Sequence, residues 1–164
     1  SCMGWDTTAL RWSVAPPDNP LHQQRLEGVR AAGKARGRLR QLNIVPGDFS
    51  VESGHAAAMA MLAAAPVPTA VFCFSDQMAL GTLAACRELG IRVPEDLSIV
   101  GFDDLASSRY LTPPLTTIRQ PMREIGERAV NLLLAIIEHV DVPLQQTLDF
   151  SLMLRGSTAA PRAG

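Results

Sequence analysis

The sequence predicts an α/β fold in which a mostly parallel sheet is covered by helices on both faces. Short apolar segments alternate with longer segments of helical periodicity along most of the chain. Prolines, glycines and capping residues separate these segments by short connections, which is typical of strand–helix–strand units. At 164 residues the chain has the length of one domain with a sizeable core.

The first half of the chain predicts two strands and two helices. Expected are a strand at 10–15, a helix at 21–36, a strand at 42–45 and a helix from 51 to Pro66. The proline-rich cluster 16–20, Gly37 and Pro46-Gly47 interrupt the pattern between these elements. Ser50 is a suitable N-cap for the last of these helices, and Glu52 favours its positive first turn.

The second half continues the alternation. Expected are a strand at 70–74, a helix at 76–89, a strand at 97–102, a short helical turn near 106–110, a helix at 122–139 and a strand at 146–154. Apolar residues recur at three- and four-residue spacing from Met122 to Val140, which predicts a strongly amphipathic helix. Residues 1–9 have no clear pattern. Residues 155–164 are rich in small residues and are expected to be a disordered tail.

Composition argues against several classes of protein. The net charge of −1 argues against nucleic-acid binding through the field of this chain. Three scattered cysteines favour a reducing cytoplasm over a secreted disulfide scaffold. The longest apolar stretch, 56–65, is shorter than the ~20 residues that a membrane span needs. No secretion signal opens the chain, so we expect a cytoplasmic location without membrane contact.

Residues suited to catalysis or metal binding do not form a known arrangement. His22, His55 and His139 lack metal-ligand spacing. The basic run 30–40 lies at the end of a helix, where the helix dipole favours cations. Asp103-Asp104 could hold Mg²⁺ or accept a phosphoryl group, but no further carboxylates or phosphate-binding lysine accompany the pair. We therefore expect no enzymatic activity, no metal and no cofactor.

Asp103 and Phe49 are candidates for ligand contacts. Asp103 directly follows a buried strand, and ligands of open α/β sheets bind just beyond the carboxyl ends of strands. A carboxylate there could accept hydrogen bonds from sugar hydroxyls or base N–H groups; alternatively, it could cap the turn at 105–110. Phe49 precedes a helix, where it could stack on a sugar or a purine. Equally, it could pack as a hydrophobic staple.

Three linked motifs resemble the LacI family of ligand-responsive transcription repressors. They read SDQMALG at 75–81, RVPEDLSIVGFDD at 92–104 and RYLTPPLTTIRQP at 109–121, and the similarity extends over 10–154. The resemblance implies a type I periplasmic-binding-protein-like subdomain, mainly the C-terminal one of the effector-binding domain. It implies that helix 122–139 crosses toward an N-terminal subdomain. We expect that subdomain and a helix-turn-helix head to be absent from this chain.

The resemblance also implies the ligand-contacting residues, which are Arg25, Phe49, Asp103 and Gln120. Ser75 belongs with them, at a position where many members carry Asn, so a short hydroxyl replaces a long amide. Asn19, where some members have a second arginine, favours a neutral, sugar-like effector over an anion. Half of the ligand cleft would be missing here, and operator DNA would be bound only through the absent head.

A homodimer is implied too, with contacts at Met78, Leu80, Tyr110 and Leu111. Leu80 is the most informative, because Ala79, Leu83 and Cys86 already provide a helical face toward the sheet. Met78 could equally belong to the core. A periplasmic sugar-binding protein of the same fold is the alternative function, and the repressor-like wording of the motifs argues against it.

Overall fold

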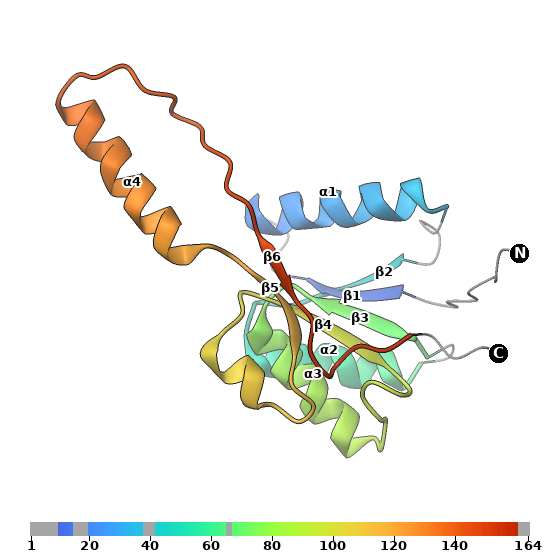
Figure 1. Cartoon of the computed structure of the whole chain (residues 1–164). Helices are drawn as coiled ribbons and strands as arrows, with labels where there is room; N and C mark the ends of the chain where they lie inside the picture. The colour runs from blue at the N-terminus through green and yellow to red at the C-terminus, as the bar shows by residue number, and fades with distance from the viewer. Residues whose placement is uncertain (1–9, 15–19, 38–41, 65–66, 161–164) are drawn as a thin grey trace, which may run out of the picture.

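The computed structural model, shown in Figure 1, is built on a six-stranded sheet. It describes residues 10–14, 20–37, 42–64 and 67–160. The strands are β1 (Leu10–Val14), β2 (Leu42–Pro46), β3 (Ala70–Cys73), β4 (Ser98–Phe102), β5 (Thr116–Arg119) and β6 (Ser151–Met153). Their order is β2-β1-β3-β4-β5-β6, and only β6 runs antiparallel to its neighbour. The predicted α/β class with a mostly parallel sheet is confirmed.

Helices cover both faces of this sheet, as expected. Helix α1 (Pro20–Ala35) lies on one face, and α2 (Val51–Leu62) and α3 (Asp76–Glu88) lie together on the other (Figure 1). Strand β3 shows why both faces need cover. Its Val71 and Cys73 belong to the core beneath α2 and α3, whereas Phe72 packs with Phe74 in a smaller cluster beneath α1. Alternate side chains of a strand point to opposite faces, so burial on both sides makes the strand apolar throughout.

Helices α2 and α3 approach each other closely through two glycines. A Cβ atom on Gly54 would lie 2.3 Å from the Met78 carbonyl oxygen, and one on Gly81 would lie 2.0 Å from the Val51 carbonyl oxygen. Both helices begin at serine caps: Ser50 accepts from the Ser53 N–H and Ser75 from the Met78 N–H. The predicted cap at Ser50 is confirmed, and the helix pair fixes the segments that precede both helices.

Met78 corrects one expectation about α3. Its side chain is fully buried, so the prediction of a surface position is wrong for this residue. The reason is that α3 is covered on two sides, by the sheet and by α2, which widens its buried face beyond the stripe of Ala79, Leu83 and Cys86. Leu80 is only partly buried.

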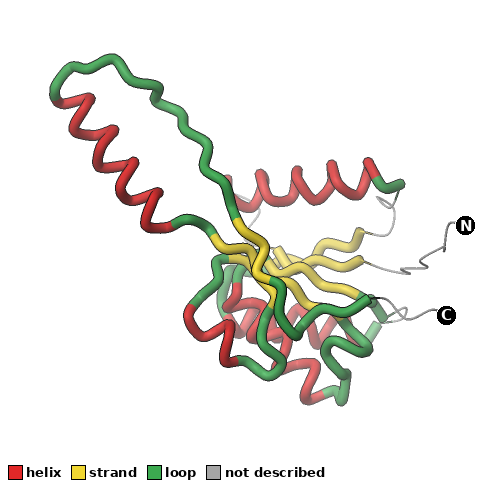
Figure 2. The backbone as a smooth tube through the Cα atoms, viewed as in Figure 1, coloured by secondary structure: helices red, strands yellow, loops and turns green. Residues whose placement is uncertain are grey.

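Helix α4 (Met122–Ile137) stands away from the sheet as an arm, and residues 138–150 return from it in extended form, as Figures 1 and 2 show. No residue of α4 is buried, although its amphipathic pattern is the strongest among the described helices. Strand β6 is much shorter than the predicted 146–154. Residues 146–150 have no strand beside them on the way back, and pairing begins only where Ser151 meets Arg119. None of the described helices is long and apolar enough to cross a membrane.

The segment after β6 does not form the disordered tail expected from residue 155. Ser157 is fully buried; its hydroxyl donates to the Ile99 carbonyl at 2.6 Å and accepts from the Thr116 N–H at 2.8 Å. These bonds anchor 155–160 across β4 and β5, so the expectation is wrong for this stretch. Residues 161–164 and 1–9 lie outside the described part of the chain.

Candidate functional site

The predicted ligand residues meet at the carboxyl ends of the parallel strands. Asp103 follows β4 and Gln120 follows β5, and the Gln120 Nε2 donates to Asp103 Oδ1 at 2.8 Å. Arg25 reaches the same edge from α1, where its Nη1 donates to the carbonyl oxygen of Phe74, just beyond β3. The Arg25 guanidinium carbon lies 3.8 Å from the centre of the Phe102 ring and 5.9 Å from that of Phe49. Residues from five segments of the chain therefore form one cluster.

Arg25 and Asp103 are both half-buried and influence each other's charge. Burial lowers the pKa of Arg25, and the nearby Asp103 carboxylate opposes this effect. Burial raises the pKa of Asp103, while Arg25 and the hydrogen bond from Gln120 oppose it. The cluster thus contains one cationic and one anionic side chain, and each opposes the effect of burial on the pKa of the other. Among the described residues, one Asp103 oxygen carries a side-chain hydrogen bond, which leaves acceptor capacity on this carboxylate.

Unusual backbone conformations mark this cluster. Phe49, Asp103 and Asp104 have positive φ angles of 70°, 111° and 51°. Residues other than glycine adopt such angles at a cost of about 1–3 kcal/mol each, and residues strained in this way cluster at functional sites. The strain at Phe49 and Asp103 is therefore a second indication that these two side chains are held where a ligand would meet them.

The alternative interpretation of Phe49 as a hydrophobic staple does not fit the structure. A staple packs the residue before the N-cap against the fourth helical residue, which here is Gly54 and has no side chain. Phe49 instead contacts the edges of both core clusters and stays half-buried. Its carbonyl oxygen accepts a hydrogen bond of 3.3 Å from the Ser75 hydroxyl.

Ser75 supports the site from beneath. It is 5% exposed, and its hydroxyl also caps α3 by accepting from the Met78 N–H at 3.1 Å. Its donor is directed to Phe49, and one of its two acceptor lone pairs is used by the helix. These contacts position Phe49, and a ligand contact of Ser75 stays a prediction.

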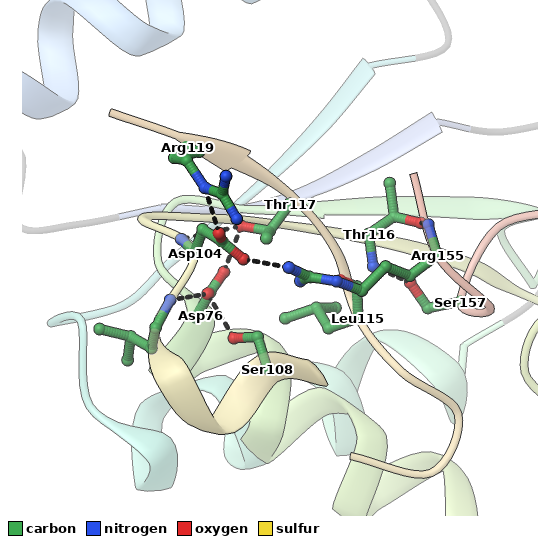
Figure 3. A network of polar contacts seen from close by, with 10 residues as sticks. Asp76, Asp104, Ser108, Leu115, Thr116, Thr117, Arg119, Arg155 and Ser157 are labelled. Atoms are coloured by element: carbon green, nitrogen blue, oxygen red, sulfur yellow. Dashed lines mark hydrogen bonds and ion pairs between the residues drawn. The ribbon is translucent and has the colours of Figure 1, made fainter. Parts of the chain in front are cut away.

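A buried carboxylate, Asp76, organises the turn that carries Asp103 (Figure 3). It accepts hydrogen bonds from the Leu105 N–H at 2.8 Å and from the hydroxyls of Ser108 and Thr117 at 2.5 Å each. The 3₁₀ turn Ala106–Tyr110 has no side-chain cap of its own. The alternative that Asp103 caps this turn is therefore excluded. The N–H of Leu105, the residue before the turn, instead donates to the Asp76 carboxylate on α3.

Asp104 has a different partner set from its neighbour Asp103. Arg119 Nε donates to its Oδ2 at 2.6 Å and Arg155 Nη2 to its Oδ1 at 2.5 Å (Figure 3). Both oxygens are thus taken by arginines, which argues against a shared Mg²⁺ site at Asp103 and Asp104. Within the described ranges no group of three acids, histidines or cysteines could hold a metal ion. Sequence reasoning missed the network around Asp76 and Asp104, because its bonds join distant positions.

The expected dimer residues other than Met78 gather on one surface. Tyr110 is 79% exposed, and Leu80 and Leu111 are half-buried. All three line a groove that lies over α3 and the segments after it, together with Ile91, Val93 and Pro113.

Comparison with known proteins places this geometry in a family. The model of the periplasmic binding protein-like domain matches residues 7–158. The chain belongs to this family. It is 43% identical over 149 residues to the HTH-type transcriptional repressor CytR of Escherichia coli (strain K12), covering 90% of this chain and 44% of the relative. It is 43% identical over 141 residues to the repressor PurR of Actinobacillus pleuropneumoniae serotype 3, covering 84% and 42%.

Solved structures agree with this placement. A dimeric lac repressor with an 11-residue C-terminal deletion has a TM-score of 0.89 at 36% identity, over 95% of this chain and 57% of that chain. The transcriptional regulator CelR in complex with cellobiose has a TM-score of 0.83 at 34% identity, over 92% and 47%. The predicted resemblance to LacI-type regulators is thereby confirmed. The chain spans less than half the length of the curated relatives named above.

Proposed function

We propose that this chain is the effector-sensing part of a LacI-type transcription repressor, and that it binds a neutral small molecule at the carboxyl edge of the sheet. The observation that carries the proposal is the convergence of Arg25, Phe49, Asp103 and Gln120 from separate segments. The sequence relatives named above are repressors and not enzymes, which supports regulation over catalysis. No observation favours a periplasmic transport role instead.

The chemistry of the cluster favours a sugar or a related neutral compound. The Asp103 carboxylate can accept from hydroxyl or N–H groups, and the Gln120 amide can both donate and accept. Phe49 offers an apolar ring for the face of a sugar or base. The Arg25 charge already faces Asp103 and the Phe102 ring, so little of it remains to attract an anion.

We further propose that the protein acts as a cytoplasmic homodimer, without a cofactor, and contacts operator DNA through a helix-turn-helix head. The CytR and PurR relatives are HTH-type repressors, and the lac repressor has been solved as a dimer bound to operator. The groove at Leu80, Tyr110 and Leu111 offers the apolar and aromatic side chains typical of an interface centre. Effector binding would shift the dimer between two states of different DNA affinity.

Calorimetry on the complete gene product tests this proposal. The panel contains lactose, cellobiose, cytidine, adenosine and glucose 6-phosphate. We expect a neutral compound to bind, and Arg25→Gln to weaken its binding at least about tenfold, or ~1.4 kcal/mol. Arg30→Gln is the matched control, because Arg30 is exposed on the same helix. Binding of the phosphorylated sugar alone, or equal effects of both variants, would contradict the proposed site.

A further inference from the structure

Three consecutive backbone N–H groups hold the turn 103–105, which carries Asp103 out of β4. Their acceptors are, from Asp103 to Leu105, the Ile118 carbonyl at 2.9 Å, the Thr117 hydroxyl at 3.4 Å and the Asp76 carboxylate at 2.8 Å. Only the first of these bonds joins the turn to the main chain of the neighbouring strand. The conformation of the turn therefore depends on two side chains, Thr117 from β5 and Asp76 from α3.

Thr117 and Asp76 are bonded to each other and form one support. The Thr117 hydroxyl donates to Asp76 Oδ1 at 2.5 Å and accepts from the Asp104 N–H, so two N–H groups of the turn lead to the same carboxylate. The other oxygen, Oδ2, accepts from the Leu105 N–H and from the Ser108 hydroxyl (Figure 3). Asp76 is 2% exposed and Thr117 is fully buried, so solvent does not compete for these bonds.

Strand β4 leaves space for this carboxylate. A Cβ atom on Gly101 would lie 2.3 Å from Asp76 Oδ1, so a larger residue there would displace the carboxylate from its place beneath the turn. The φ angle of Gly101 is not positive, which means that space and not backbone freedom explains the glycine. The glycine two residues before Asp103 is thus part of the same support.

The supported turn is also a strained part of the chain. Asp103 and Asp104 have φ angles of 111° and 51°, and residues other than glycine keep such angles only where the surrounding structure holds them. We propose that Asp76, with Thr117 as its relay, is a positioning residue that holds the turn in this conformation and so directs the Asp103 carboxylate to the effector. The inference rests on the proposed function in one respect, that Asp103 contacts the effector. Asp76 is buried and acts only through the turn.

Hydrogen exchange at single amides tests the support without an effector. It is measured on the complete gene product by mass spectrometry with gas-phase fragmentation. The readout is the exchange rate of the Asp104 and Leu105 amides divided by that of the β4 amides in the same chain. Global opening accelerates all these amides together, so the ratio isolates the turn. In Asp76→Asn a neutral amide replaces the carboxylate and its charge-assisted bonds, and we expect the ratio to rise about tenfold.

The hydroxyl relay provides a second variant and its rescue. Thr117→Val should also raise the ratio, most strongly at the Asp104 amide, whereas Thr117→Ser keeps the hydroxyl and should restore the parent value. Thr82→Val is the matched control. Thr82 is 1% exposed, and its hydroxyl donates to the Met78 carbonyl within α3 at 3.0 Å. This variant removes an equally buried hydroxyl, so it should lower overall stability and leave the ratio unchanged.

Circular dichroism establishes which variants fold. A folded Asp76→Asn protein with the parent ratio would overturn the proposal, and so would an equal rise in Thr82→Val. If Asp76→Asn does not fold, Thr117→Val decides by the same criterion. Failure of both to fold would assign Asp76 to overall stability and overturn the positioning role. Because no effector enters the measurement, these outcomes are distinct from a failure of the sensing function, which calorimetry detects.

Discussion

Gly81→Ala is the sharpest test of how the helix pair positions the site. A Cβ atom at this position would lie 2.0 Å from the Val51 carbonyl oxygen and 2.6 Å from the His55 nitrogen. Both are backbone atoms of α2, so no side-chain rotation relieves the overlap, and the helices must separate. Val51 begins α2 two residues after Phe49, so the separation also reaches the candidate ligand site.

The expected magnitude follows from two opposing effects. Overpacking of a tight contact costs about 1–3 kcal/mol, and the large overlap here places Gly81→Ala at the upper end. Alanine recovers about 1 kcal/mol of helix propensity relative to glycine. The net loss in the free energy of unfolding is then roughly 2 kcal/mol. For a domain of this size it corresponds to a fall in Tm of about 4–8 °C.

Urea and thermal unfolding measured by circular dichroism provide the assay. Gly126→Ala is the matched control, since a Cβ on this glycine of α4 meets no atom within 4 Å. That variant should gain up to about 1 kcal/mol of stability from propensity alone. If Gly81→Ala were as stable as Gly126→Ala, the close approach of α2 and α3 would be refuted.

Two further predictions concern the site and the groove. In the complete gene product, Asp103→Asn should weaken effector binding by about 1.5–3 kcal/mol, the scale of a hydrogen bond to a charged group. Because the folded protein raises the pKa of Asp103, the stability contributed by this group is present below its unfolded pKa and lost as pH rises through the folded pKa. Urea unfolding of both proteins from pH 3.5 upward should show the variant gaining on the parent protein; a relative loss would reverse the sign of the argument. Leu80→Asp should give a folded monomer by sedimentation and circular dichroism, whereas an unfolded chain would make Leu80 core and an intact dimer would move the interface elsewhere.

The order of elements could be predicted because its signals are local. Ser50 lies just ahead of a helix, Gly37 ends one, and apolar runs of four or five residues identify the strands. These features depend on residues within one or two turns, so they can be recognised before the fold is known. The same locality explains the error at 146–154, where a strand-like composition has a partner over only three residues.

Burial on the second side of a helix cannot be recognised in this way. The spacing of Ala79, Leu83 and Cys86 correctly indicates the side of α3 that faces the sheet. The contact of α2 with Met78 depends on Gly54, which is 24 positions earlier in the chain. A glycine has no side chain, so it adds nothing to the apolar pattern from which such a contact could be predicted. Ser157 is similar, because its two partners lie on strands far upstream.

The candidate site likewise contains residues that local sequence signals could predict and residues that only distant contacts reveal. Its proposed ligand residues Asp103 and Gln120 stand directly after strands, where the topology of a parallel sheet gathers polar side chains. The residues that hold them carry no such mark. Asp76 looks like an ordinary acid in the first turn of a helix, and Arg155 like part of a tail. These two residues nevertheless hold the turn and the strands that carry the proposed ligand residues. A site on this fold can therefore be located from strand ends, whereas the means by which it is held rigid follow only from contacts between distant segments.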